Sequence, residues 1–164
     1  MTTGGSFMGL SIKLRQLPPR LAAGAFFLHS GIEKLSADEE TAAKLHGFAS
    51  GTYPFLGKLK PKDFARILAV GEIAVGAMLV VPVVPGIVAG AGLTAFAGGT
   101  VGLYIRTPGL RKPGSPLPTE NGIPIAKDIW LLGIGLGLVV DDIDDVVNYQ
   151  ACPPPGSRVR LLPR

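Results

Sequence analysis

Between Glu72 and Arg106 the sequence runs for 33 residues without a charged side chain. Pro82 and Pro85 interrupt this run, and proline inside a helix removes a backbone hydrogen bond and clashes with the preceding turn. About 20 consecutive apolar residues are enough for a helix to cross the hydrocarbon core of a bilayer. The run therefore predicts the end of one membrane-spanning helix, a short uncharged turn and a complete second span.

The composition also indicates lipid, because it is too apolar for an ordinary soluble domain. Hydrophobic residues make up 47% of the 164 residues, and the mean hydropathy is +0.39. The 23 glycines and 15 prolines follow no triplet period, which excludes a collagen-like chain. The net charge is +4, but the basic residues flank the apolar stretches, as anchors at phospholipid headgroups do. Membrane lipids are the expected surroundings, and we expect no nucleic-acid partner.

Four apolar stretches can be placed along the chain, and they predict an all-α fold, namely a four-helix transmembrane bundle. The spans are predicted at residues 19–35, 64–81, 86–104 and 124–142. They form one membrane domain, residues 17–147. A polar N-terminal tail, residues 1–16, is expected to be loosely held, and a Pro- and Arg-rich tail covers residues 148–164.

The first long connection is predicted to contain a short amphipathic helix, residues 37–48, that lies in the membrane interface. Ser36 and Glu39 have the spacing of a capping box, with Ser36 as the N-cap. The second long connection, residues 107–125, holds five prolines and three glycines, which predicts an extended loop.

Four spans place both termini and the 82–86 turn on one side of the membrane and the two long connections on the other. Six Lys and Arg residues fall on the side of the termini and ten on the opposite side. That excess favours cytoplasmic connections, whereas the basic flank of the first span favours a cytoplasmic N-terminus. The two rules conflict, so the orientation stays open.

Ionisable residues inside the predicted spans are the candidate functional groups, because a charge at the bilayer centre costs about 2.5–3.5 kcal/mol or more. Glu72 lies near the middle of the second span. It is either a proton-handling or quinone-contacting carboxylate, or a structural partner for a cation or hydroxyl on the first or fourth helix.

His29 and Glu33 lie one helical turn apart, on a face of the first span that we expect to point at the other helices. They form either part of a proton relay or ligand site, or a hydrogen-bonded pair near the membrane surface. The topology also brings two charged pairs to the same end of the bundle, which predicts a polar cluster as the candidate site. The members of that cluster are Glu33, Lys34, Lys127 and Asp128.

Small residues repeat at a spacing of four along the third and fourth spans. Such grooves let helix backbones approach closely, which is how helices associate in lipid. We expect helix packing along two sets of residues. These are Gly86, Gly90, Thr94, Gly98 and Gly102 in the third span, and Gly133 and Gly137 in the fourth.

Other motifs are absent or weak. No His, Cys, Asp or Glu residues follow a metal-ligand spacing, so no metal is predicted, and no nucleotide or hydrolase motif occurs. No cleavage site follows the first apolar stretch, so we do not expect a cleaved signal peptide. The four aspartates within 141–145 are interpreted as a solvated acidic cap, and Cys152 as an exposed residue of the tail.

Residues 20–140 resemble the DoxX family of small bacterial membrane proteins. The resemblance depends on a few positions, most clearly on Glu72 followed by Gly76 and an aliphatic run. The other positions are Arg20, Gly31, Lys34, Leu35, the Tyr53-Pro54-Phe55 run and the segment Lys127–Val140. The Pro-rich loop and the acidic run at 141–145 depart from the family pattern.

The resemblance implies a multi-pass, four-helix protein of the plasma membrane, in a family whose members serve as accessory subunits or as parts of quinone-linked and redox-defence systems. We therefore carry two hypotheses. The first is a non-catalytic accessory or assembly subunit that docks on other membrane subunits, or on copies of itself, through its small-residue faces. The alternative is a quinone-linked oxidoreductase component with an intramembrane site of Glu72, His29 and Glu33. No other cofactor is predicted.

Overall fold

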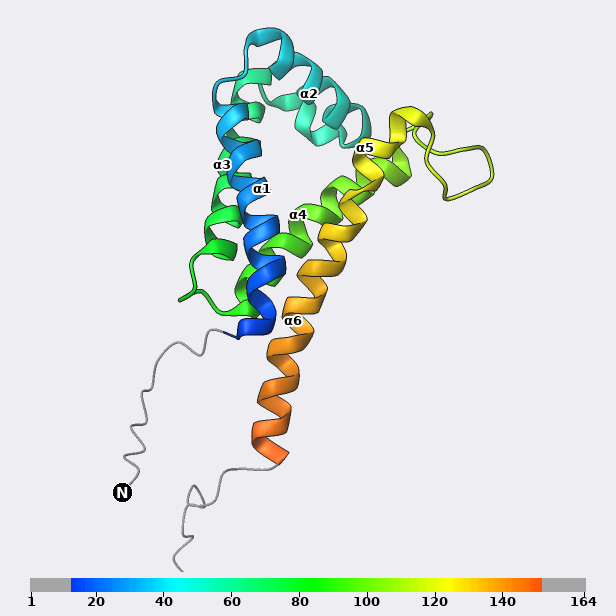
Figure 1. Cartoon of the computed structure of the whole chain (residues 1–164). Coiled ribbons are helices and arrows are strands. Elements are labelled where there is room, and N and C mark those ends of the chain that lie inside the picture. Colours follow the sequence, from blue (N-terminus) through cyan, green and yellow to red (C-terminus); the bar gives the residue numbers. More distant parts are fainter. Residues whose placement is uncertain (1–12, 152–164) are drawn as a thin grey trace, which may run out of the picture.

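The computed structural model describes residues 13–151, and nearly all of these are helical (Figure 1). Among the described residues there is no strand, only an isolated antiparallel bridge between Arg111 and Pro118. The predicted all-helical class is confirmed. The α-helices are α1 (Leu17–Leu35), α2 (Glu39–Thr52), α3 (Pro61–Val80), α4 (Gly86–Arg106), α5 (Ile123–Ala126) and α6 (Asp128–Ala151).

Three short 3₁₀ helices lie between or before the α-helices: η1 (Leu14–Gln16), η2 (Pro54–Lys58) and η3 (Glu120–Gly122). Prolines lie in the first turn of α1 and of α3, where the missing N–H group would have had no helical partner. The tail residue Cys152 lies outside the described residues.

The capping box predicted at Ser36 is wrong, because Asp38 is the N-cap of α2. The Asp38 side chain accepts a hydrogen bond from the backbone N–H of Thr41 at 2.8 Å, and this bond lowers the pKa of Asp38. Ser36 instead ends α1, where its backbone N–H bonds the carbonyl of Glu33. A carboxylate satisfies the free N–H groups of a helix start and also complements the positive end of the helix dipole.

Helices α1 and α3 form one closely packed pair, and glycines allow the approach. A Cβ atom on Gly31 would lie 2.8 Å from the Ala69 carbonyl oxygen, and one on Gly76 would lie 3.0 Å from the Gly24 carbonyl oxygen. The buried face of α1 is therefore its glycine face, which also contains Phe27.

The face of α1 that we expected to point inward is turned outward, which is a correction. Among its residues Phe26, His29 and Glu33 are all exposed. The close glycine contact with α3 decides the rotation of α1, because backbones that nearly touch gain more packing than a face of bulky or polar side chains would allow.

Helices α4 and α6 form the second pair. A Cβ on Gly90 would lie 2.6 Å from the Gly135 carbonyl oxygen, and a Cβ on Gly135 would lie 2.5 Å from Thr94 Oγ1. Gly135, which the sequence analysis did not select, thus makes the contact that was expected of Gly133 and Gly137.

The other small residues have separate surroundings. Gly86 faces Gln16 and Asp142, and Gly102 faces the Tyr53 hydroxyl. A Cβ on Gly98, Gly133 or Gly137 would meet no atom of another element within 4 Å in the described part of the chain. The small residues that were predicted to pack against other helices therefore divide into packed positions and open positions.

The two pairs converge near the α3–α4 turn and diverge toward the other end, where α2 extends across the gap between them (Figure 1). The buried core fills the convergent part, with Phe27, Leu79 and Leu93 as its largest fully buried side chains. The start of α1, the α3–α4 turn and the end of α6 lie at the same end of the molecule.

Two segments among the described residues are long and apolar enough to cross a membrane. They are Gly86–Arg106, which is α4, and Glu120–Val147, which contains α5 and most of α6. This finding is consistent with a membrane protein.

Candidate functional site

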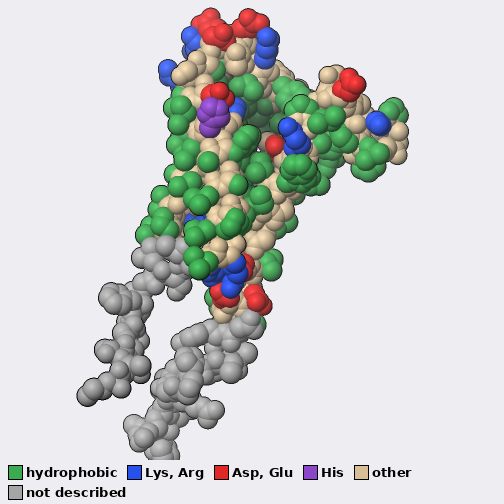
Figure 2. Space-filling model, viewed as in Figure 1, with side chains coloured by type: hydrophobic (Ala, Val, Ile, Leu, Met, Phe, Trp, Pro, Cys, Tyr) green, Lys and Arg blue, Asp and Glu red, His purple; other side chains and the backbone are tan. Residues whose placement is uncertain are grey.

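A cavity of about 300 Å³ lies between the two helix pairs, beneath α2. We call it the chamber. All six α-helices contribute to its wall, which is mostly apolar and includes five of the seven phenylalanines of the chain. These five are Phe26, Phe27, Phe48, Phe64 and Phe96. Figure 2 shows the surface hollowed below α2 on this face of the molecule.

An ion pair between α1 and α3 forms part of the chamber wall. Lys34 Nζ donates to Glu72 Oε2 at 2.9 Å and to Ser30 Oγ at 2.6 Å. The Glu72 side chain is 8% exposed and that of Lys34 is 21% exposed. Lys34 lies in the last turn of α1, where a cation is favoured by the negative end of the helix dipole. Glu72 therefore has a cation on the first helix as its partner.

Asp128 supplies a second carboxylate to the chamber. It is the first residue of α6 and lies beside Thr100 of α4, which also lines the chamber. Lys127 and Lys34 act on Asp128 through their charge, but no Lys or Arg nitrogen of the described residues forms an ion pair with it. The chamber wall thus holds two carboxylates and one cation.

The predicted polar cluster is corrected in two of its four members. The structure brings Lys34 and Asp128 together at the chamber, whereas Glu33 and Lys127 are exposed and do not line it. One helical residue is a rotation of about 100°, which turns Glu33 away from the chamber when Lys34 faces it, and Lys127 lies in the turn between α5 and α6.

His29 and Glu33 form a pair on the outer face of α1. His29 Nε2 lies 3.5 Å from Glu33 Oε1, and the two side chains are 73% and 68% exposed. Neither residue lines the chamber. The three-residue site that combined them with Glu72 is therefore wrong, for the same reason that fixes the rotation of α1.

Helix α2 covers the chamber, and Tyr53, which directly follows α2, attaches it to α4. Tyr53 Oη donates to the Gly99 carbonyl at 3.0 Å, and the Arg106 guanidinium lies 5.8 Å from the centre of the Tyr53 ring. Gly102 leaves room for the Tyr53 hydroxyl. The Tyr53-Pro54-Phe55 run was noticed in the sequence only as part of a resemblance, and its role depends on this tertiary contact.

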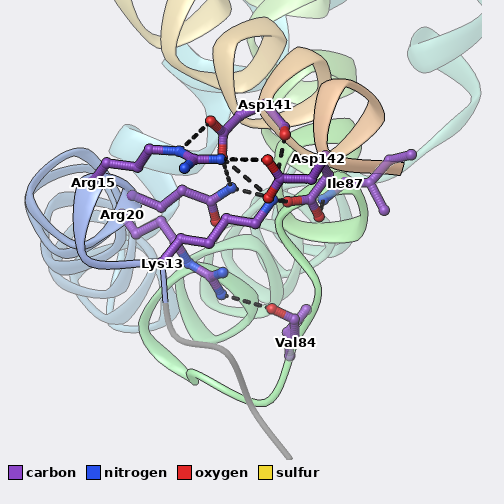
Figure 3. Close-up of polar contacts among 9 residues, drawn as sticks. Lys13, Arg15, Arg20, Val84, Ile87, Asp141 and Asp142 are labelled. Atoms are coloured by element: carbon purple, nitrogen blue, oxygen red, sulfur yellow. Dashed lines mark hydrogen bonds and ion pairs between the residues drawn. The ribbon is translucent and has the colours of Figure 1, made fainter. Parts of the chain in front are cut away.

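The opposite end of the molecule is held by an electrostatic cluster between the N-terminal segment and α6 (Figure 3). Asp141 and Asp142 accept hydrogen bonds from Gln16, and both form ion pairs with Lys13. Arg15 forms ion pairs with both Asp141 and Asp145. The solvated acidic cap and the loosely held residues 13–16 are therefore corrected.

Asp142 has a further role in this cluster, because its Oδ2 accepts the backbone N–H of Ile87 at 2.7 Å, at the start of α4. Burial lowers the pKa of Lys13, but its hydrogen bonds to Asp142 and Asp145 outweigh burial, so the pKa is raised overall. The cluster ties η1, α4 and α6 together.

Arg20 is buried, although the sequence predicted an anchor at the headgroups. Its exposed fraction is 6%. Its Nε donates to the Leu79 carbonyl at 2.8 Å, and its Nη2 donates to further carbonyls at the end of α3 and in the following turn. These belong to Met78, Val81 and Val84, the last of which Figure 3 shows. The guanidinium supplies donors to carbonyls that no longer have helical partners.

Comparisons with protein-family models, with curated proteins and with solved structures found no match. Among the described residues, no group of three or more His, Cys, Asp and Glu side chains is arranged to hold a metal ion.

Proposed function

We propose that this chain is a multi-pass membrane protein similar to the DoxX family, in which α1, α3, α4 and α6 cross the plasma membrane and α2 lies at its surface. At 1.5 Å per residue, a 19-residue helix such as α1 is about 28 Å long, close to the thickness of the hydrocarbon core. The outer faces of α1 and α3 expose large apolar side chains. Examples are Leu21, Ile32, Ile67 and Val70.

The charges of α1 and α3 support the same proposal. Arg20, Lys34 and Glu72 are turned toward other helices and have hydrogen-bonding partners there. His29, Glu33 and Arg66 are exposed, and all three lie within six residues, about 9 Å, of the ends of α1 and α3 next to α2, where Arg66 can extend to the headgroups and His29 is paired with Glu33. This arrangement avoids charged side chains in contact with acyl chains.

Within this protein, the chamber binds a small and largely apolar molecule taken up from the bilayer. The observation that carries this proposal is the chamber itself, an apolar cavity of about 300 Å³ with a few polar groups at one place in its wall. Binding pockets for small molecules have this character and begin at about this volume. In the quinone-linked version of the proposal, Lys34 and Glu72 contact the ring, while His29 and Glu33 are not involved.

Filling the chamber should remove the bound molecule. Leu45 of α2 lines the chamber, so Leu45→Trp adds a bulky ring to it. We expect the unmodified protein, purified in mild detergent, to retain a hydrophobic small molecule detectable by native mass spectrometry, and the variant to lose it. Leu21→Trp, on the exposed outer face of α1, is the matched control and should retain it. Equal retention by both variants would contradict the binding role.

A second candidate function is the accessory or assembly subunit, and the open glycines of α6 favour it. Gly133 and Gly137 lie one turn apart, and a Cβ on either would have no neighbouring element of the described residues within 4 Å. Large exposed side chains, Ile129, Trp130, Leu136 and Val140, lie on the same helix. A further helix of another subunit, or of a second copy, can approach closely there.

The subunit candidate predicts that Gly137→Leu releases the chain from a larger assembly without unfolding it, because the added side chain enters only the open face. Native mass measurements on gently solubilised membranes should show the unmodified chain in a complex and the variant as a monomer. Finding the unmodified chain only as a monomer would end this candidate.

A further inference from the structure

The polar groups of the chamber are unequal in charge, and this inequality bears on the head of the bound molecule. Two carboxylates, Glu72 and Asp128, line the chamber together with a single cation, Lys34. The Lys34 ammonium is already committed to Glu72 and to the Ser30 hydroxyl. The carboxylate of Asp128 therefore faces the chamber without a cation bonded to it among the described residues.

The chamber wall also offers a ligand more free hydrogen-bond acceptors than free donors. The Thr100 hydroxyl has a single proton, for which the Ala97 carbonyl of its own helix and the Asp128 carboxylate are the two acceptors, so it offers a ligand in the chamber mainly an acceptor. A ligand whose head only accepts hydrogen bonds finds few free donors in this wall. A head that donates hydrogen bonds or carries positive charge finds the Asp128 carboxylate and the Thr100 oxygen side by side.

The aromatic lining favours the same kind of ligand. Five phenylalanines line the chamber, of which Phe26 is 59% exposed, and Phe27 and Phe96 meet edge to face across the two helix pairs, with ring centres 4.9 Å apart. The face of an aromatic ring attracts cations, most strongly where water is excluded, and aromatic cages are the usual means of binding ammonium groups.

We infer that the ligand of the chamber is an organic cation, an amine or quaternary ammonium on a short aromatic or aliphatic body. The ammonium pairs with Asp128 and contacts the phenylalanine rings, while the body occupies the apolar part between the helix pairs. This inference rests on the proposed binding role, and it adds to that role the charge of the head.

Three probes with the same body and different heads test the inference: 4-phenylbutylamine, 4-phenylbutan-1-ol and 4-phenylbutyrate. At pH 7 these are cationic, neutral and anionic. Calorimetric titration of the full chain in dodecyl maltoside, corrected for uptake by empty micelles, should show the amine binding about 10-fold more tightly than the alcohol, and the carboxylate most weakly. Equal binding of amine and alcohol, or tighter binding of the alcohol or the carboxylate, would overturn the inference.

Variants assign the preference to the chamber. Asp128→Asn should reduce the preference for the amine over the alcohol to within about 2-fold. Asp63→Asn, at an exposed carboxylate in the first turn of α3, should leave the preference unchanged. Phe48→Leu keeps this part of the chamber wall apolar but removes an aromatic ring, and it should weaken the binding of the amine more than the binding of the alcohol. An undiminished preference in Asp128→Asn would overturn the inference.

The outcomes separate this inference from the proposal beneath it. If all three probes bind equally and Leu45→Trp abolishes their binding, the chamber binds apolar molecules and the inferred charge is wrong. If no probe binds the unmodified chain more tightly than it binds Leu45→Trp, the binding role itself fails, and the inference fails with it.

Discussion

Replacing Arg20 with lysine should lower the free energy of unfolding by about 3 kcal/mol or more, because one buried and three partly buried carbonyls lose the guanidinium as a donor at once. The guanidinium reaches four carbonyl oxygens at the end of α3 and in the turn that leads to α4. A lysine ammonium is a single point on a flexible stem and cannot reproduce a planar group that spans them. Leaving one buried carbonyl without a partner costs about 1–3 kcal/mol.

Thermal or denaturant unfolding in mild detergent measures this effect. Arg15→Lys is the matched control, since Arg15 is an exposed arginine whose partners are the carboxylates of Asp141 and Asp145. It should leave the unfolding transition close to that of the unmodified protein. If Arg20→Lys unfolds in the same way as Arg15→Lys, the buried guanidinium does not hold the α3–α4 turn.

Removing either partner of the Lys34–Glu72 pair should be costly, whereas removing both should not. Lys34→Met leaves the buried Glu72 carboxylate without its cation, and breaking a buried pair in this way costs about 3–5 kcal/mol. Glu72→Met likewise leaves the Lys34 ammonium without its carboxylate partner. The double variant replaces both charges with apolar side chains of similar length, which is often neutral or stabilising.

A double-mutant cycle on unfolding free energies checks this second result. Because each single loss is expected to cost about 3–5 kcal/mol and the double variant little, the expected coupling energy is about 6 kcal/mol or more, larger than for most pairs in one network. Glu40 and Lys44 provide the control cycle, because they form an ion pair of 2.6 Å on α2 with side chains 75% and 74% exposed. Exposed pairs of this kind couple by less than about 0.5 kcal/mol. Additive losses at Lys34 and Glu72 would show that the pair does not act as a unit.

The positions of the helices were largely predictable, because proline and the absence of charge are local properties. Pro82 and Pro85 separate α3 from α4 where the sequence indicated, and α4 begins at Gly86 as predicted. The ends were less predictable. Helix α2 continues to Thr52, beyond the predicted end at residue 48, because packing against α3 and the 3₁₀ turn η2 supports its last turn.

The candidate site was predictable only in part. Glu72 was selected because a carboxylate inside an apolar run is expensive, and that reason requires no knowledge of its neighbours. Its partner depended on the rotation of α1, which placed Lys34 inside and Glu33 outside. The five phenylalanines of the chamber come from four helices, so their convergence has no signature in the sequence.

The sequence by itself determined that this chain is helical, where its helices are interrupted, and which carboxylate would need shelter, since these follow from periodicity, proline and the cost of buried charge. Only the tertiary structure decided which face of each helix is buried. It brought Arg20 to the end of α3 and tied residues 13–16 to the acidic end of α6. The physical reason is that close contacts such as Gly31 with Ala69 and Gly90 with Gly135 fix helix rotation through interlocking shapes, and shape complementarity belongs to a pair of helices and not to either sequence alone.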